Sequence, residues 1–62
     1  NNQSEERRRA SGLTQLEFAE KVGVSRKSIN SIENGIYIPT TVLALKMATV
    51  LNCTIHDLFQ LP

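Results

Sequence analysis

The sequence predicts an all-α fold, a compact single domain of five helices, and three observations support this prediction. Apolar residues recur every three or four positions along most of the chain, the period of a helix that packs on one side. No segment alternates strictly between apolar and polar residues, as a half-buried strand would. Helix-capping residues mark the starts, at Thr14, Ser25, Thr40 or Thr41, and Thr54, and helix-ending residues follow at Gly12, Gly23, Gly35 and Asn52.

The first helix ends near Gly12, and the second and third have clearer signals. The second is expected at about residues 15–22, where Thr14 and Glu17 form a capping box in which each side chain satisfies a free backbone amide. The third is expected from residue 26 to residue 33 or 34, behind Ser25. Hydrophobic staples reinforce both starts, Leu13 with Phe18 and Val24 with Ile29.

The fourth helix is expected at about residues 41–51, after Pro39, which disfavours helix in the residue before it. Its core face holds Leu43, Ala44, Met47, Ala48 and Leu51. The fifth helix is one or two turns at about residues 55–59, with a second capping box and a third staple. These pairs are Thr54 with Asp57 and Cys53 with Leu58.

Length and composition exclude several classes of protein. A chain of 62 residues holds one domain at most, spanning 1–62. Cys53 is the single cysteine and His56 the single histidine, so we expect neither a disulfide nor a metal site, and no cofactor. No apolar run approaches the roughly 20 residues that cross a bilayer. We therefore expect no membrane association. No acid, base and nucleophile share a convincing spacing, so we also expect that the protein is not an enzyme.

Charge alone does not indicate a nucleic-acid partner, because the net charge is only +1. The cations are unevenly distributed, however, since every Lys and Arg except Lys46 lies within residues 1–27. The run Arg7-Arg8-Arg9 is compatible with a solvated helix end and equally with a nucleic-acid contact. It therefore decides nothing by itself.

Residues 15–33 are the most informative segment, because only Gly23-Val24-Ser25 separates the second helix from the third. Gly23 can adopt the left-handed conformation that ends a helix, and Ser25 starts the next helix at once. Two helices joined by so short a turn must cross at a steep angle. The spacing therefore predicts a helix-turn-helix motif.

With the apolar residues of both helices turned inward, the third helix exposes Arg26, Lys27, Asn30 and Ser31. Arg and Lys suit guanine, Asn suits adenine, and Ser suits several bases. Arg26 and Lys27 also lie at the positive end of the helix dipole, an unfavourable position that a bound phosphate would relieve. The alternative is a basic helix end that is merely solvated.

Several segments together resemble the Cro/C1-type (XRE-like) helix-turn-helix family of phage and bacterial repressors. They are Thr14-Gln15, Phe18-Ala19, Gly23-Val24-Ser25, Ile29 and Ile32-Glu33-Asn34-Gly35. The resemblance covers about residues 8–59. Tyr37-x-Pro39, residues 43–48 and Asp57-Leu58-Phe59 resemble the compact stand-alone members, whose domain is lambda-repressor-like. The resemblance implies a cytoplasmic transcriptional regulator that associates with the nucleoid when bound to DNA.

The resemblance also implies roles for individual residues. The third helix would enter the major groove, with Arg26, Lys27 and Ser31 at base-reading positions and Asn30 as an addition. Phosphate contacts would come from Gln15, Ser25, Ser28, Asn34 and Tyr37. For Tyr37 the alternative is a ring packed over the fourth helix. Arg8 and Glu33 would form a structural ion pair between the first and third helices, and neither would then read bases.

Two positions depart from the family pattern in the N-terminal half. Ser4 and Arg7 stand where the family has apolar residues, so the first helix lacks an obvious anchor and residues 1–6 are expected to be frayed or displaced. Leu16 stands where the family tends to be polar. It is either exposed or compensates for the weak first helix.

Surplus apolar side chains indicate a partner. Val42, Leu45 and Thr49 lie on a different stripe of the fourth helix from its core face, and Leu61 follows the fifth helix with no evident cover. The resemblance implies a twofold homodimer with recognition helices about 34 Å apart on a palindromic operator. The alternative is that these residues complete a small core. A second candidate function is an antitoxin-type protein binder that also represses its own operon.

Overall fold

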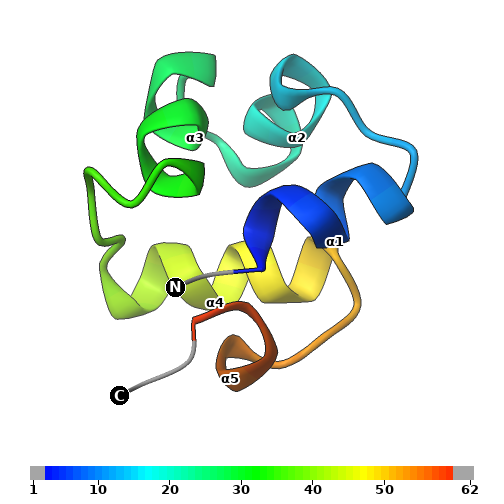
Figure 1. Cartoon of the computed structure of the whole chain (residues 1–62), viewed down its shortest axis with the longest axis vertical. Coiled ribbons are helices and arrows are strands. Elements are labelled where there is room, and N and C mark those ends of the chain that lie inside the picture. Colours follow the sequence, from blue (N-terminus) through cyan, green and yellow to red (C-terminus); the bar gives the residue numbers. More distant parts are fainter. Residues whose placement is uncertain (1–2, 60–62) are drawn as a thin grey trace.

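Five helices account for most of residues 3–59, the part of the chain that the computed structural model describes (Figure 1). They are α1 (Ser4–Ala10), α2 (Gln15–Val22), α3 (Arg26–Glu33), α4 (Thr41–Val50) and α5 (Ile55–Leu58). This confirms the all-α, five-helix fold. The helices α4 and α5 each end one residue earlier than the sequence predicted.

Side-chain caps determine where the later helices begin. The Oγ1 of Thr14 accepts a hydrogen bond from the Glu17 N–H at 3.1 Å, and Glu17 Oε1 accepts one from the Thr14 N–H at 2.9 Å. Thr54 and Asp57 form the same reciprocal pair at the start of α5, at 3.1 and 3.0 Å. Of the two threonines considered for α4, Thr40 is the cap. Each pair satisfies amides that a helix start leaves free.

The core lies between α2, α3 and α4 and extends to α5. In Figure 1, α2 and α3 lie together above α4, and α5 lies below it. Leu43, which the sequence placed in the core, is only partly buried at its edge. The buried residues of the core are Phe18, Ala19, Val22, Ile29, Ile32, Met47, Ala48, Leu51 and Leu58.

The helix α1 is anchored more firmly than the sequence indicated. It begins at Ser4, whose side chain is 0% exposed, so the expected fraying is wrong for residues 3–6. The Gln3 N–H donates to the carbonyl oxygen of Leu58 at 2.7 Å, which ties the start of α1 to the end of α5. Ser4 is small enough to be fully enclosed at this position. Residues 1 and 2 lie outside the described part of the chain.

The turn between α2 and α3 depends on backbone conformation. Gly23 has φ 89°, in the left-handed region, and ends α2. A Cβ at this position would meet no atom within 4 Å, so the requirement for glycine comes from φ and not from space. The Ser25 Oγ then accepts from the Ser28 N–H at 3.1 Å and starts α3. The predicted short turn therefore sets the crossing of the two helices.

The capping boxes make the stability of the fold depend on pH. Hydrogen bonds from the backbone N–H of Thr14 and of Thr54 hold the pKa values of Glu17 and Asp57 below their ordinary values. The unfolded chain therefore binds protons before the folded chain does, as the pH falls. The stabilisation is complete above the unfolded pKa values, near 4, and is lost as the pH falls further.

We therefore expect the thermal unfolding temperature to decrease as the pH is lowered from about 5 to about 3. The double variant Glu17→Gln/Asp57→Asn should have a lower unfolding temperature than the wild-type chain at pH 7. Its unfolding temperature should decrease less between pH 7 and pH 3, because its capping side chains no longer titrate. Circular dichroism melts at each pH measure both. Equal losses in the wild-type chain and the variant would contradict a role for these caps.

Candidate nucleic-acid interface

The helix α3 has one buried side and one polar side. Ile29 and Ile32 are both 0% exposed. Arg26, Lys27 and Asn30 are exposed and Ser31 is half-buried. Residues four apart lie on one face of a helix, so these four side chains form one polar surface. Figure 1 shows α3 at the periphery of the molecule beside α2.

The N-terminus of α3 is suited to anions. No acidic residue lies in its first turn, and its first two residues are the cations Arg26 and Lys27. The cap of Ser25 satisfies the Ser28 N–H, and the two serine hydroxyl oxygens are 3.0 Å apart. The N–H groups of the first helical residues have no partner within the helix. Cationic side chains and free amides together favour a phosphate oxygen or a base acceptor.

A buried ion pair connects α1 to α3. The Arg8 Nε donates to Glu33 Oε2 at 2.7 Å, and its Nη2 donates to Glu33 Oε1 at 3.3 Å. The Arg8 Nη1 also donates to the Leu13 carbonyl oxygen at 2.8 Å. The two side chains are only 8% and 2% exposed. The structure therefore brings together the two residues that the family resemblance paired, and it neutralises a carboxylate beside the polar surface of α3.

Gln15 connects this ion pair to the polar surface. Its Nε2 donates to Glu33 Oε1 at 3.0 Å and to Asn30 Oδ1 at 3.1 Å. Its Oε1 accepts from Arg26 Nη1 at 3.1 Å. Sequence reasoning assigned Gln15 to phosphate and missed these contacts. The bonds join two different helices, so no rule of spacing within one helix could have found them.

The three arginines of the run Arg7-Arg8-Arg9 form salt bridges with acidic side chains. Arg9 pairs with Glu5 at 2.7 Å along α1, and Arg7 lies 4.0 Å from Asp57 on α5. With Arg8 bound to Glu33, every arginine of the run has a carboxylate neighbour. The run is therefore a paired surface of α1 and does not form a free cationic patch.

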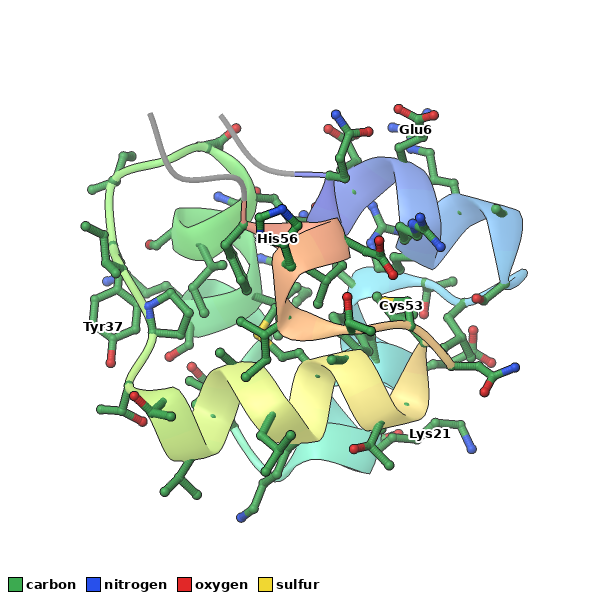
Figure 2. The ribbon with its side chains drawn as sticks, turned by 90° about the horizontal axis from the view of Figure 1, so that it is seen from below. Glu6, Lys21, Tyr37, Cys53 and His56 are labelled. Carbon is green, nitrogen blue, oxygen red and sulfur yellow. The ribbon has the colours of Figure 1, made fainter. Side chains whose placement is uncertain are left out.

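The loop after α3 exposes several large side chains. Asn34 is exposed, and Tyr37 is 44% exposed and projects from the loop in Figure 2. Ile36 and Ile38, on either side of Tyr37, are 79% and 86% exposed. The Ser31 carbonyl accepts from the Ile36 N–H at 2.9 Å and so holds the loop against the end of α3.

The outer stripe of α4 is also exposed. Val42 and Leu45 are 65% and 57% exposed, so the alternative that they complete the core is wrong. Thr49 is exposed and its hydroxyl donates to the Leu45 carbonyl at 2.8 Å. Leu16 on α2 is 54% exposed and does not compensate for α1 by packing. Leu61, the fourth residue of the candidate dimer surface, lies outside the described residues.

Two other reactive side chains lie away from α3. His56 is exposed on α5, and Cys53 is half-buried before it (Figure 2). Burial raises the pKa of the Cys53 thiol. Within residues 3–59 no three His, Cys, Asp or Glu side chains gather as a metal site would require. No helix in the same part of the chain is long and apolar enough to cross a bilayer.

Comparison with known proteins agrees with this geometry. The helix-turn-helix family model matches residues 5–58, which includes all of α2 to α5 and nearly all of α1. The chain belongs to the Cro/C1-type helix-turn-helix family. Proteins of this family are DNA-binding transcriptional regulators, and the chain carries the family's motif in α2 and α3.

The chain is similar to several regulators and solved structures with a helix-turn-helix domain. An uncharacterised HTH-type transcriptional regulator of Archaeoglobus fulgidus is 52% identical over 48 residues, which are 77% of this chain and 69% of the relative. YgzD of Bacillus subtilis, also an uncharacterised HTH-type regulator, is 37% identical over 60 residues, 97% of this chain and 91% of the relative. A solved complex of the SinR and SinI proteins matches with a TM-score of 0.84 and 29% identity over 92% of this chain. This chain spans just over half, 56%, of that solved chain.

The burial of the Arg8–Glu33 ion pair predicts how a change at Glu33 affects the stability of the fold. Glu33→Gln should lower the free energy of unfolding by about 3–5 kcal/mol, because it leaves the buried Arg8 guanidinium without a counter-charge. A core of this size supplies only about 3–5 kcal/mol, so the variant should be largely unfolded at 25 °C. Urea unfolding followed by circular dichroism measures the change.

The double variant Arg8→Met/Glu33→Leu is the matched control, because it removes both charges and keeps the volume apolar. It should be clearly more stable than Glu33→Gln. A loss of about 0.5 kcal/mol or less in Glu33→Gln, typical of an exposed pair, would contradict the structural role.

Proposed function

We propose that this protein is a sequence-specific double-stranded DNA-binding repressor that acts as a homodimer and inserts α3 into the major groove. The observation that carries the proposal is the polar surface of α3. It combines hydrogen-bonding side chains, two cations at a helix N-terminus and a neighbouring carboxylate that is already neutralised. The proposed role is binding, without a catalytic step.

In this proposal the residues divide into two groups. Arg26, Lys27, Asn30 and Ser31 contact base edges, because they share the exposed side of α3. Gln15, Ser25, Ser28, Asn34 and Tyr37 contact phosphates, which sets the register on the duplex. For Gln15 the supporting group is its backbone N–H at the start of α2, since both hydrogens of its side-chain amide are bound internally.

The proposed dimer uses the outer stripe of α4. Val42 and Leu45 present apolar side chains to solvent, and a small domain gains stability by burying such surface. Thr49 and Leu61 complete the proposed surface. A twofold dimer would place two α3 helices about one DNA turn, or 34 Å, apart and would recognise a palindromic operator.

A second candidate is an antitoxin-type module that binds another protein and represses its own operon. The similarity to a complex of two different proteins, SinR and SinI, favours this candidate, as do the exposed Ile36 and Ile38. The same α3 surface would serve DNA in both cases. The two candidates differ in whether the apolar surface binds a second copy or a different protein.

The first test is selection of bound duplexes from a random DNA pool at near-physiological salt. The proposal expects a palindromic consensus whose half-sites are one helical turn apart, and a steep loss of affinity with rising salt. Failure of the folded protein to enrich any sequence would overturn sequence-specific binding.

Base reading by α3 is tested by Arg26→Ala and Lys27→Ala. Each should lose about 1–3 kcal/mol of binding free energy on the selected duplex and should relax the choice of base. Lys46→Ala removes an exposed cation from α4 and is the matched control for net charge. Fluorescence anisotropy on the selected and the base-substituted duplexes measures the effects. Equal losses on every duplex would show that these residues bind phosphate only.

The dimer surface is tested by Val42→Glu and Leu45→Glu. Each should shift the chain from dimer to monomer in sedimentation experiments, because a carboxylate cannot be buried unpaired in an apolar interface. Leu16→Glu changes an equally exposed leucine on α2 and should leave the dimer intact. A wild-type chain that is monomeric at all concentrations, with and without DNA, would refute the homodimer.

A further inference from the structure

We propose that the outer stripe of α4 also binds an acidic amphipathic helix of a different protein, which competes with the second copy for this surface and so separates the dimer. The stripe consists of Val42, Leu45 and Thr49, and the exposed lysines Lys21 and Lys46 border it. This inference rests on the proposed function and deepens it, because it names the chemistry of a partner that regulates the proposed dimer.

The outer stripe of α4 is apolar along about two helical turns. Val42 and Leu45 are 65% and 57% exposed. The third position is a threonine, but its hydroxyl donates to the Leu45 carbonyl oxygen at 2.8 Å within the helix. Thr49 therefore brings no unsatisfied donor to a partner. The spacing of three and four residues gives a ridge that another helix can cover with apolar residues at the same spacing.

The charges that border this stripe are positive. Lys46 is the single charged residue of α4. It follows Val42 by four residues and precedes Thr49 by three, so it lies at the edge of the stripe. Lys21 is in the last turn of α2, which packs on α4, and Figure 2 shows it beside the C-terminal end of α4. Neither lysine forms a salt bridge within residues 3–59.

The carboxylates of α2 leave Lys21 available to a partner. Glu17 lies one turn before Lys21 and attracts it, but the Thr14 N–H holds the Glu17 carboxylate at the start of α2. Glu20 is exposed, yet consecutive residues point about 100° apart around a helix, so it does not face Lys21. Two cations beside an apolar stripe therefore fit a partner helix that flanks its apolar residues with Asp or Glu.

A second copy of the chain complements this surface less completely. A twofold interface brings the α4 helices of both copies together, and neither contains an acidic residue to pair with Lys46. An acidic helix covers the stripe and pairs with the lysines, so it can displace the second copy.

The partner helix would act on the dimer and would leave α3 uncovered. Ile29 and Ile32 on α3 and Met47 on α4 all turn into the same core, so the exposed sides of the two helices face away from each other. Figure 1 shows α3 above α4, in agreement with this arrangement. Separation of the dimer would nevertheless weaken operator binding, because each monomer carries a single recognition helix.

The test begins with helical peptides displayed on phage, with apolar residues fixed at every third or fourth position and the flanking positions randomised. Selection on the wild-type chain should enrich Asp and Glu at the flanking positions. The most enriched peptide should bind Lys21→Ala/Lys46→Ala about threefold to tenfold more weakly at low salt. Arg26→Ala/Lys27→Ala removes the same charge from α3 and is the matched control, whose affinity for the peptide should be unchanged.

Two results of this selection would overturn the inference. One is enrichment of peptides without an excess of acidic residues. The other is an acidic peptide that binds the two double variants equally, because its attraction would then be to overall charge. All four substitutions replace exposed side chains, so both variants should keep the fold, and circular dichroism melts verify this.

Competition is measured on the wild-type chain with the same peptide. The peptide should shift the chain from dimer to monomer in sedimentation experiments and should release the selected DNA duplex. A peptide that binds while the dimer stays intact would overturn the competition. If DNA selection yields a palindromic operator but no peptide depends on the two lysines, the inference fails and the proposed function stands. If the chain enriches no DNA, the proposed function fails, and the variant affinities alone decide whether the stripe binds an acidic helix.

Discussion

The buried pair of Arg8 and Glu33 is the interaction on which the other features of this domain depend. It fastens α1, which has little apolar surface of its own, to the helix that carries the polar surface. It also neutralises a carboxylate that would otherwise repel phosphate. Such a pair gains little net stability over an apolar replacement of the same volume. Its main effect here is to fix the positions of the groups around it, such as the Gln15 side chain, which donates a hydrogen bond to Glu33.

Local signals in the sequence were sufficient for most of the fold. The capping boxes at Thr14 and Thr54 and the turn at Gly23 are determined by residues within three positions of one another, so spacing alone located them. The inward faces of α2 and α3 followed from helical periodicity for the same reason. Errors arose where packing between distant segments decided the outcome. Ser4 offers no apolar signal, yet it is fully buried, next to Gln3, whose N–H is bonded to the end of α5.

In the candidate site, too, features set by local sequence could be predicted and features set by contacts between distant residues could not. The exposed residues of α3 could be identified from the sequence, because they are the ones left over when Ile29 and Ile32 turn inward. The Arg8–Glu33 contact spans 25 positions, and only the family resemblance indicated it. The contacts of Gln15 to Asn30 and Arg26 depend on how two helices cross and on side-chain torsions. Neither quantity is encoded in a local pattern, so these bonds became visible only in three dimensions.

The pairing of all three arginines in α1 affects how such a protein would find its target. With those charges compensated and a net charge of +1, little long-range field remains to hold the domain on arbitrary DNA. Random chromosomal sites compete in vast excess over an operator, and weak attraction to them leaves more molecules unsequestered. Four cations remain without a salt bridge within residues 3–59: Arg26 and Lys27 at the start of α3, Lys21 on α2 and Lys46 on α4. So small a number limits the sequestration of a DNA-binding domain by non-specific chromosomal sites. In the proposed function, a small number of copies can then suffice to keep a single operator occupied.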